Sequence, residues 1–178
     1  LKVRLLHARA VRIDPQSHAV LNEKGAALRY DRLLIATGSM ALKLKVPGAQ
    51  LQGVVKLDNL VDAHAIFKLS RKGRTAVVAG GGITALEILE GLAARGMRVH
   101  YFLRGDRYWP NVLDATESKI VEQRLSEHGV KIHRQTEIAE ILPARGRTPT
   151  VAGVRSTQGV VVPCNVVGVA IGVRPRKE

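Results

Sequence analysis

Short apolar runs that end on glycine are the main repeated feature of this sequence. Residues 76–79 read Ala-Val-Val-Ala and lead directly into Gly80. Two further runs, LLIATG at 33–38 and VGVAIG at 167–172, resemble each other in the same way. Short runs rich in β-branched residues are typical of strands buried on both faces of a parallel sheet. The pattern therefore predicts three buried strands, each followed by a glycine turn, the first of them within residues 30–38.

Between these strands the apolar spacing changes to that of helices. A first helix is expected from residue 59 to about residue 72, with Asp58 as its N-cap. A second follows the glycines and ends at Arg95-Gly96, and a third begins at a capping box over 114–117 and ends near His128-Gly129. The residues expected to face the core are Leu60, Ala63, Ile66 and Phe67 in the first helix, Leu86, Leu89, Leu92 and Ala93 in the second, and Ile120, Val121 and Leu125 in the third.

The remaining strands complete an α/β fold. Residues 98–103 and 130–133 are expected to join 76–79 in a small doubly wound parallel sheet. Shorter alternating segments predict a front β-meander and, later, an antiparallel excursion. The meander strands are expected at 3–6, 10–13, 19–21 and 27–29, and those of the excursion at 138–142, 151–155 and 160–162. Residues 39–57, interrupted by Pro47-Gly48, are expected to be a linker that contains a domain boundary.

The segment 75–104 carries the most specific chemistry. Gly80 and Gly82 occupy the first two positions of the dinucleotide fingerprint G-x-G-x-x-G/A, and Ala85 occupies the third, where a small side chain allows close packing of helix and strand. The first N–H groups of a helix have no internal partner and carry partial positive charge, so a diphosphate can satisfy both. A tight turn in another α/β protein is the alternative. The flanking strands and helix have the lengths that a dinucleotide site needs, and they favour the binding of NAD or NADP.

The residues after the second strand bear on the choice between the two dinucleotides. An Asp or Glu at this point would bind the ribose 2′-OH of NAD, but the sequence has Leu103 and then Arg104. Arg104 and Arg107 would pair with a 2′-phosphate, which favours NADP by a small margin. The alternative is that both arginines are solvated and that Asp106 reaches the ribose.

Composition narrows the function classes. The formal net charge is +13, but residues 1–50 carry nine Lys/Arg against three Asp/Glu, while residues 101–150 carry eight against seven. The excess is scattered, and aromatic residues make up only 3% of the chain, which argues against nucleic-acid binding. No apolar run approaches 18 residues and no signal-peptide pattern is present, so we expect a cytoplasmic protein without a membrane segment.

The remaining candidate groups are less specific. The single cysteine, Cys164, is expected to be a small buried residue rather than a reactive thiol, and the six histidines share no metal-ligand spacing, so no metal site is expected. The one aromatic cluster, Tyr108-Trp109-Pro110, is interpreted as loop packing, with a lid over the adenosine as the alternative.

Three segments together resemble a known family. YDRLLIATGS followed by VPG is similar to the segment where the chain leaves the FAD domain in the pyridine nucleotide-disulfide oxidoreductase superfamily. GGGITALE resembles its NAD(P) fingerprint, LRGDRYWPNVLD the strand and loop that follow, and VAIGVRP the re-entry into the FAD domain. The resemblance is to the branch of NADH oxidases, ferredoxin reductases and the nitrite reductase large subunit. It implies a partial FAD-binding domain at 1–50 (meander and exit strand), an NAD(P)-binding Rossmann-like domain at 51–164, and its last strand with the start of re-entry at 165–178.

The resemblance also implies roles for individual residues. The residues implied to lie under the NAD(P) diphosphate are Gly80, Gly81, Gly82 and Ala85, with Ile83 and Thr84 beside the nicotinamide half, Arg104 and Arg107 at the adenosine ribose, and Ile171 and Gly172 at the edge of the site. Glu87 is implied to face the region between flavin and nicotinamide, although a plain surface carboxylate is nearly as good an interpretation. Thr37, Gly38 and the backbone near Ala10 are implied to touch FAD in a complete enzyme.

The implied activity belongs to a complete enzyme that passes a hydride from NAD(P)H to FAD. Within these 178 residues there is no glycine fingerprint before Leu33 for the FAD diphosphate, no later Gly-Asp segment for the ribityl chain and no CxxxxC redox pair. We therefore expect this segment to hold the nicotinamide nucleotide but not FAD, and to be inactive by itself. A homodimer is implied for the complete enzyme. A non-catalytic NAD(P)-binding or sensing module is the alternative function.

Overall fold

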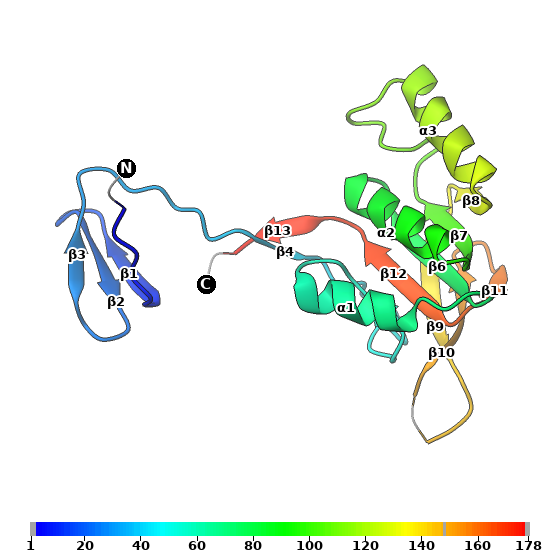
Figure 1. Ribbon diagram of the computed structural model, residues 1–178, viewed down its shortest axis with the longest axis horizontal. Helices are drawn as coiled ribbons and strands as arrows, with labels where there is room; N and C mark the ends of the chain where they lie inside the picture. Colours follow the sequence, from blue (N-terminus) through cyan, green and yellow to red (C-terminus); the bar gives the residue numbers. More distant parts are fainter. Residues whose placement is uncertain (1–2, 148, 177–178) are drawn as a thin grey trace. The chain divides into compact units, whose positions relative to one another are not determined.

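The computed structural model describes residues 3–147 and 149–176, and it divides into two compact units, Leu1–Thr37 and Gly38–Glu178 (Figure 1). The first unit contains a three-stranded antiparallel sheet of β1 (Ala10–Asp14), β2 (Ala19–Asn22) and β3 (Ala27–Arg29). Asp14 and Asn22 form the turns, since each side chain accepts two backbone N–H groups of the residues that follow. The predicted meander is confirmed for these three strands, whereas residues 3–6 form no strand.

The predicted buried strand at 30–38 is wrong. This segment has no regular structure, and Leu34 is 88% exposed. A strand requires a neighbour for its backbone groups, and a strand of a parallel sheet also needs cover on both faces. No strand among the described residues pairs with it, so its apolar composition alone does not produce a strand.

A five-stranded parallel sheet forms the centre of the second unit. Four of its strands were predicted, and the fifth, at residues 54–55, lies in the segment that we expected to be a linker. Its strands lie in the order β5-β12-β6-β7-β8, and every neighbouring pair is parallel. The bounds are β5 (Val54–Val55), β12 (Val166–Ala170), β6 (Thr75–Gly80), β7 (Arg98–Leu103) and β8 (Val130–Arg134). Because β6 lies between β12 and β7, its carboxyl end and the turn after it lie in the middle of the sheet edge, where ligands bind in open α/β folds.

The two faces of this sheet are covered differently. The core on one face joins the sheet to the helices α1 (Leu60–Leu69), α2 (Ile83–Ala94) and α3 (Ala115–Glu127). The other face packs against an antiparallel sheet in the order β11-β10-β9. Its strands are β9 (Ile138–Pro143), β10 (Val151–Ser156) and β11 (Val161–Pro163). The expected excursion is therefore confirmed, and it serves as the third layer of the unit in the place of helices on that face.

The helices begin and end close to the predicted residues, but in α1 and α3 some residues that we expected to face the core are exposed. Leu60 is 74% exposed and Phe67 58%, while Ile66 and Leu69 pack on the core from α1. Phe67 instead lies under the Arg95 guanidinium, 3.8 Å from its ring centroid. In α3, Ile120 is 64% exposed, because the inward face carries polar residues that bond to a loop described below.

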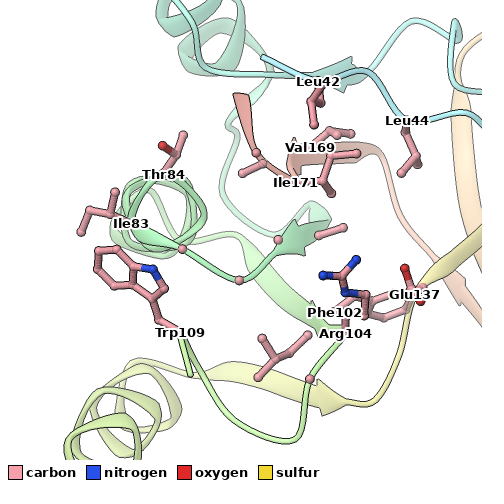
Figure 2. Close-up of a pocket in the computed structure, with 18 of the residues that line it drawn as sticks. Leu42, Leu44, Ile83, Thr84, Phe102, Arg104, Trp109, Glu137, Val169 and Ile171 are labelled. Carbon is pink, nitrogen blue, oxygen red and sulfur yellow. The ribbon is translucent and has the colours of Figure 1, made fainter. Parts of the chain in front are cut away.

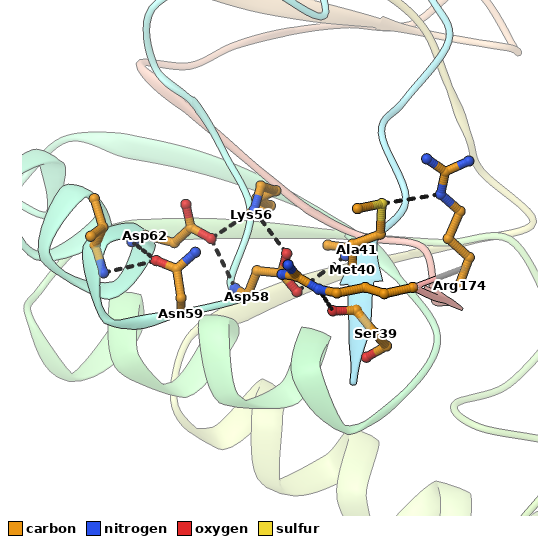
Figure 3. Close-up of polar contacts among 10 residues, drawn as sticks. Ser39, Met40, Ala41, Lys56, Asp58, Asn59, Asp62 and Arg174 are labelled. Atoms are coloured by element: carbon orange, nitrogen blue, oxygen red, sulfur yellow. Dashed lines mark hydrogen bonds and ion pairs between the residues drawn. The ribbon is translucent and has the colours of Figure 1, made fainter. Parts of the chain in front are cut away.

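A short antiparallel sheet that the sequence did not predict joins the two ends of the second unit. β4 (Ser39–Ala41) pairs with β13 (Val173–Pro175). Of the two strands, β4 lies in the segment that we interpreted as a linker. Asp58 accepts the Ala41 N–H at 3.1 Å, and Lys56 bridges Asp58 and Asp62 at 3.1 and 2.8 Å (Figure 3). Asp58 is thus a tether for β4 and is not the N-cap of α1. The N-cap is Asn59, whose side chain accepts two N–H groups of the first turn.

Residues 39–50 therefore fold with the second unit, whereas the expected first domain extends to residue 50. The assignment of the domains to particular cofactors stays a prediction. Among the described residues, no helix combines the length and the apolar character that crossing a membrane requires.

Candidate functional site

The turn between β6 and α2 is shaped by close packing at its first glycine. Gly80 has φ +155°, and a Cβ placed on it would lie 2.2 Å from the carbonyl oxygen of Ala170 on β12. The same Cβ would lie 3.1 Å from that of Ala85, which is itself fully buried. The first and third positions of the fingerprint are therefore small because β6, β12 and α2 meet there.

The other two glycines are small for a different reason. A Cβ on Gly81 or Gly82 would have its nearest neighbour at 3.8 Å, so packing against the protein does not require glycine at either position. Gly82 is the N-cap of α2 and has no side chain to cap the helix. Its carbonyl accepts the N–H groups of Ala85 and Leu86, and the N–H groups before them point out of the helix end. This end is suited to an anion that approaches the backbone directly.

A pocket of about 830 Å³ opens at this helix end. Its lining comes from the carboxyl ends of β6, β7 and β12, the start of α2, and the segments after β4 and β7 (Figure 2). The lining residues include Gly80, Gly81, Gly82, Ile83, Thr84, Arg104, Arg107, Trp109, Glu137, Ile171 and Gly172. The volume is that of a site for a large organic ligand.

One side of the pocket is basic. Figure 2 shows Arg104 beside Phe102 and Glu137, away from the start of α2. Arg107 also lines the pocket, and its Nε atom is buried without a hydrogen-bond partner among the described residues. Asp106 does not line the pocket, and its carboxylate lies 3.8 Å from Arg107 Nη1. The structure therefore brings both predicted arginines to the site, and the acidic residue that lines the pocket with them is Glu137 rather than Asp106.

Trp109, farther along the loop after β7, forms another wall of the pocket, and α3 holds this part of the loop in place. The Glu122 carboxylate is buried and accepts the Tyr108 N–H at 2.7 Å, and it also pairs with Arg134. Ser118 donates to the Tyr108 carbonyl at 2.7 Å. Tyr108 is 1% exposed, burial raises the pKa of its hydroxyl, and its ring meets that of Trp109 edge to face. The aromatic cluster is thus partly loop packing, through Tyr108, and partly pocket wall, through Trp109.

The end of the pocket near β4 and β12 is apolar. Leu42, Leu44 and Leu57 line it together with Val169 and Ile171. The three leucines lie in the stretch that we interpreted as a linker, and the sequence did not identify them as site residues. No local signal identifies them, because their contact with the carboxyl end of β12 depends on the pairing of β4 with β13.

The other predicted site residues lie elsewhere. Glu87 is exposed on α2 and does not line the pocket. Thr37 ends the first unit, Gly38 begins the second, and Ala10 is exposed on β1. The contacts of these three residues with FAD in a complete enzyme stay predictions.

Other reactive side chains in the described part of the chain form no further site. Cys164 is buried, as expected, and burial raises the pKa of its thiol to about 12. His100 and His133 stack with Nδ1 and Nε2 3.0 Å apart, and burial lowers the pKa of both. No group of three or more His, Cys, Asp or Glu side chains suited to a metal ion lies within residues 3–147 and 149–176.

Comparisons with known proteins agree with this fold. Residues 2–178 match the family described as pyridine nucleotide-disulphide oxidoreductase. Rhodocoxin reductase of Rhodococcus erythropolis is 33% identical over 168 residues, which are 94% of this chain and 39% of that protein. The biphenyl dioxygenase system ferredoxin--NAD(+) reductase component of Paraburkholderia xenovorans is 32% identical over 168 residues, 93% of this chain and 40% of that protein. The ferredoxin reductase for the CYP199A2 system from Rhodopseudomonas palustris has a solved structure that aligns with a TM-score of 0.87 at 30% identity, covering 98% of this chain and 42% of that one. The chain thus spans less than half the length of these relatives.

Proposed function

The chain belongs to the pyridine nucleotide-disulphide oxidoreductase family, and from that membership we propose that its pocket binds NAD(P)H for hydride transfer to FAD in a complete enzyme. The observation that carries the proposal is the uncapped start of α2, opening with Gly81 and Gly82 onto about 830 Å³ of space. An anionic diphosphate satisfies the free N–H groups and interacts favourably with the helix dipole.

The two ends of the pocket suit the two halves of the dinucleotide. The adenosine half lies on the side of Arg104, Arg107 and Glu137, beyond the carboxyl end of β7. The nicotinamide half extends past Thr84 toward Ile171, where the lining is apolar. When bound, the reduced nicotinamide supplies the hydride, and the residues of this chain fix the orientation of its ring and exclude water from one side of it.

We propose further that the site prefers NADPH to NADH. Two guanidinium groups line the adenosine side, and the buried Nε of Arg107 has no described partner, so a 2′-phosphate would give it one. Leu103, at the usual place of the ribose carboxylate, is buried in the core and offers no acceptor. One observation favours NADH instead: the Glu137 side chain lies beside Arg104 and can accept from a ribose hydroxyl.

Calorimetric titration of the chain with NADPH and NADH tests both proposals. Arg104→Ala should weaken NADPH by about tenfold, the effect of one charge-assisted hydrogen bond, and leave NADH nearly unchanged. Arg145→Ala, at an exposed arginine that does not line the pocket, is the matched control. Equal small losses for both nucleotides would show that Arg104 does not select NADPH, and a selective loss of NADH in Glu137→Gln would indicate an NADH site. Failure of the unmodified chain to bind either nucleotide would refute the function itself.

The activity of the complete protein rests on the family, because this chain is a minor part of each relative's length. We propose that these 178 residues bind the nicotinamide nucleotide without binding FAD tightly, because their one glycine fingerprint is the turn at residues 80–85. Purified protein with stoichiometric flavin absorbance would contradict this. A homodimer of the complete enzyme stays a prediction.

A further inference from the structure

The Trp109 side chain lies close to the start of α2, where we propose that the diphosphate binds. Its indole Nε1 is 3.8 Å from the position that a Cβ on Gly82 would occupy, and its ring lines the pocket beside the first turn of α2 (Figure 2). The indole N–H is a donor only, and it makes no hydrogen bond to a described residue. A hydrogen-bond donor therefore faces the space immediately in front of the N-cap.

The backbone holds Trp109 in this place at some conformational cost. Its φ is +47°, a left-handed value that is uncommon for a bulky residue. The residue before it is fixed from both sides, since the Tyr108 N–H donates to Glu122 and the Tyr108 carbonyl accepts from Ser118. The Trp109 carbonyl accepts the N–H groups of Val112 and Leu113. The loop is thus anchored on α3, and its backbone directs the indole toward the start of α2.

We propose that the Trp109 indole N–H donates a hydrogen bond to the diphosphate of the bound dinucleotide. This inference rests on the proposed function, and it adds a side-chain donor at a helix end whose N-cap is glycine. The diphosphate is then held between the backbone N–H groups of α2 on one side and the indole on the other. Because the diphosphate is common to NADH and NADPH, Trp109 contributes to affinity for both, whereas Arg104 contributes to the choice between them.

The test compares Trp109→Phe with Trp109→Leu by calorimetric titration against NADH, NADPH and ADP-ribose. Phenylalanine keeps an aromatic face but has no N–H, and leucine has neither. We expect both variants to lose about tenfold in affinity for all three ligands, the effect of one hydrogen bond to a charged group. Near-native binding by the phenylalanine variant with a loss only in the leucine variant would overturn the proposal in favour of base stacking. Unchanged binding by both would overturn it as well.

A second measurement needs no substitution. Trp109 is the only tryptophan among the 178 residues, so the intrinsic emission reports this side chain alone. ADP-ribose has no dihydronicotinamide to accept energy, so a change in emission at saturation requires a local effect on the indole. No change on saturation with ADP-ribose would count against the hydrogen bond. If the unmodified chain binds none of the three ligands, the proposed function itself fails; if it binds them and the variants match it, only the role of Trp109 fails.

Discussion

Substituting alanine for Gly80 and, separately, for Gly82 should distinguish a glycine that the fold needs for packing from one that the ligand needs for access to the backbone. At Gly80 the added methyl would lie 2.2 Å from the Ala170 carbonyl oxygen, and the backbone φ of +155° is one that alanine rarely adopts. At Gly82 the methyl would meet only Trp109 Nε1, at 3.8 Å, and the φ of −129° is ordinary extended backbone. The first change should therefore act on the fold and the second on the bound nucleotide.

The magnitudes follow from these distances. For Gly80→Ala, the unfavourable φ costs about 1–3 kcal/mol, and displacing the β12 backbone costs about 1–3 kcal/mol more. The expected loss is roughly 2–6 kcal/mol, a large part of the stability of a typical domain. For Gly82→Ala, the poorer N-cap costs about 0.5–1 kcal/mol. Its methyl, however, occupies the space through which the diphosphate approaches α2, so binding of NADH and NADPH should weaken by at least about tenfold, or 1.4 kcal/mol.

Urea unfolding and calorimetric titration on the two variants measure both effects. The expected result is a marked fall in the unfolding midpoint for Gly80→Ala, and a near-native midpoint with weakened binding for Gly82→Ala. If Gly82→Ala binds NADPH as tightly as the unmodified chain does, the diphosphate does not approach this glycine, and the proposed site is wrong. If Gly80→Ala is fully stable, the packing argument for the first glycine fails.

Three further predictions concern the supporting structure. Glu122→Ala should destabilise the second unit by about 1–3 kcal/mol in urea unfolding, because the Tyr108 N–H loses its buried acceptor, while Glu122→Gln should keep most of the stability. Asn59→Ala should cost about 1 kcal/mol by removing the cap of α1; a loss below 0.3 kcal/mol would show that the cap is dispensable. Because burial lowers the pKa of His100 and His133 in the folded state, the unfolded chain binds more protons as the pH falls below about 6.5, so the urea midpoint should fall between pH 7.5 and pH 5. The double variant with glutamine at both histidines should show a flatter pH dependence, and an equal slope would contradict this cause.

Local signals in the sequence predicted the parallel sheet and its helices well. The strand at 98–103 and the capping box of α3 occur in the structure with the predicted bounds. Both are encoded by neighbouring residues: the first by a β-branched and aromatic run between turns, the second by an Asp and a Glu three residues apart that exchange bonds with the backbone. Neighbouring residues also predicted the uncapped glycine turn, at which we propose that a diphosphate binds.

The failures arise where structure depends on distant segments. LLIATG is as apolar as VGVAIG, but only the second has neighbours, β5 and β6, on both sides. In α1, the order Asp58-Asn59 offers two residues of similar capping ability. The tether to Ala41, 17 positions earlier, decides that Asn59 caps the helix, and nothing near residue 58 in the sequence encodes that contact. The apolar wall of the pocket was missed for the same reason.

The two ends of the pocket are therefore supported by different parts of the fold. The diphosphate end depends on β6, α2 and the loop held by Glu122, all within the core of the parallel sheet. The apolar end depends on Leu42 and Leu44, which follow β4, and β4 is attached through β13 and through Asp58. Lys56 lowers the pKa of Asp58 and so keeps its carboxylate charged, which strengthens the hydrogen bond that this carboxylate accepts from the Ala41 N–H. A displacement of β4 and β13 would thus change the wall around the proposed nicotinamide position while leaving the proposed diphosphate position intact. If the nucleotide binds as we propose, substitutions that loosen β4 should therefore change the orientation of the nicotinamide ring more than the affinity for the nucleotide.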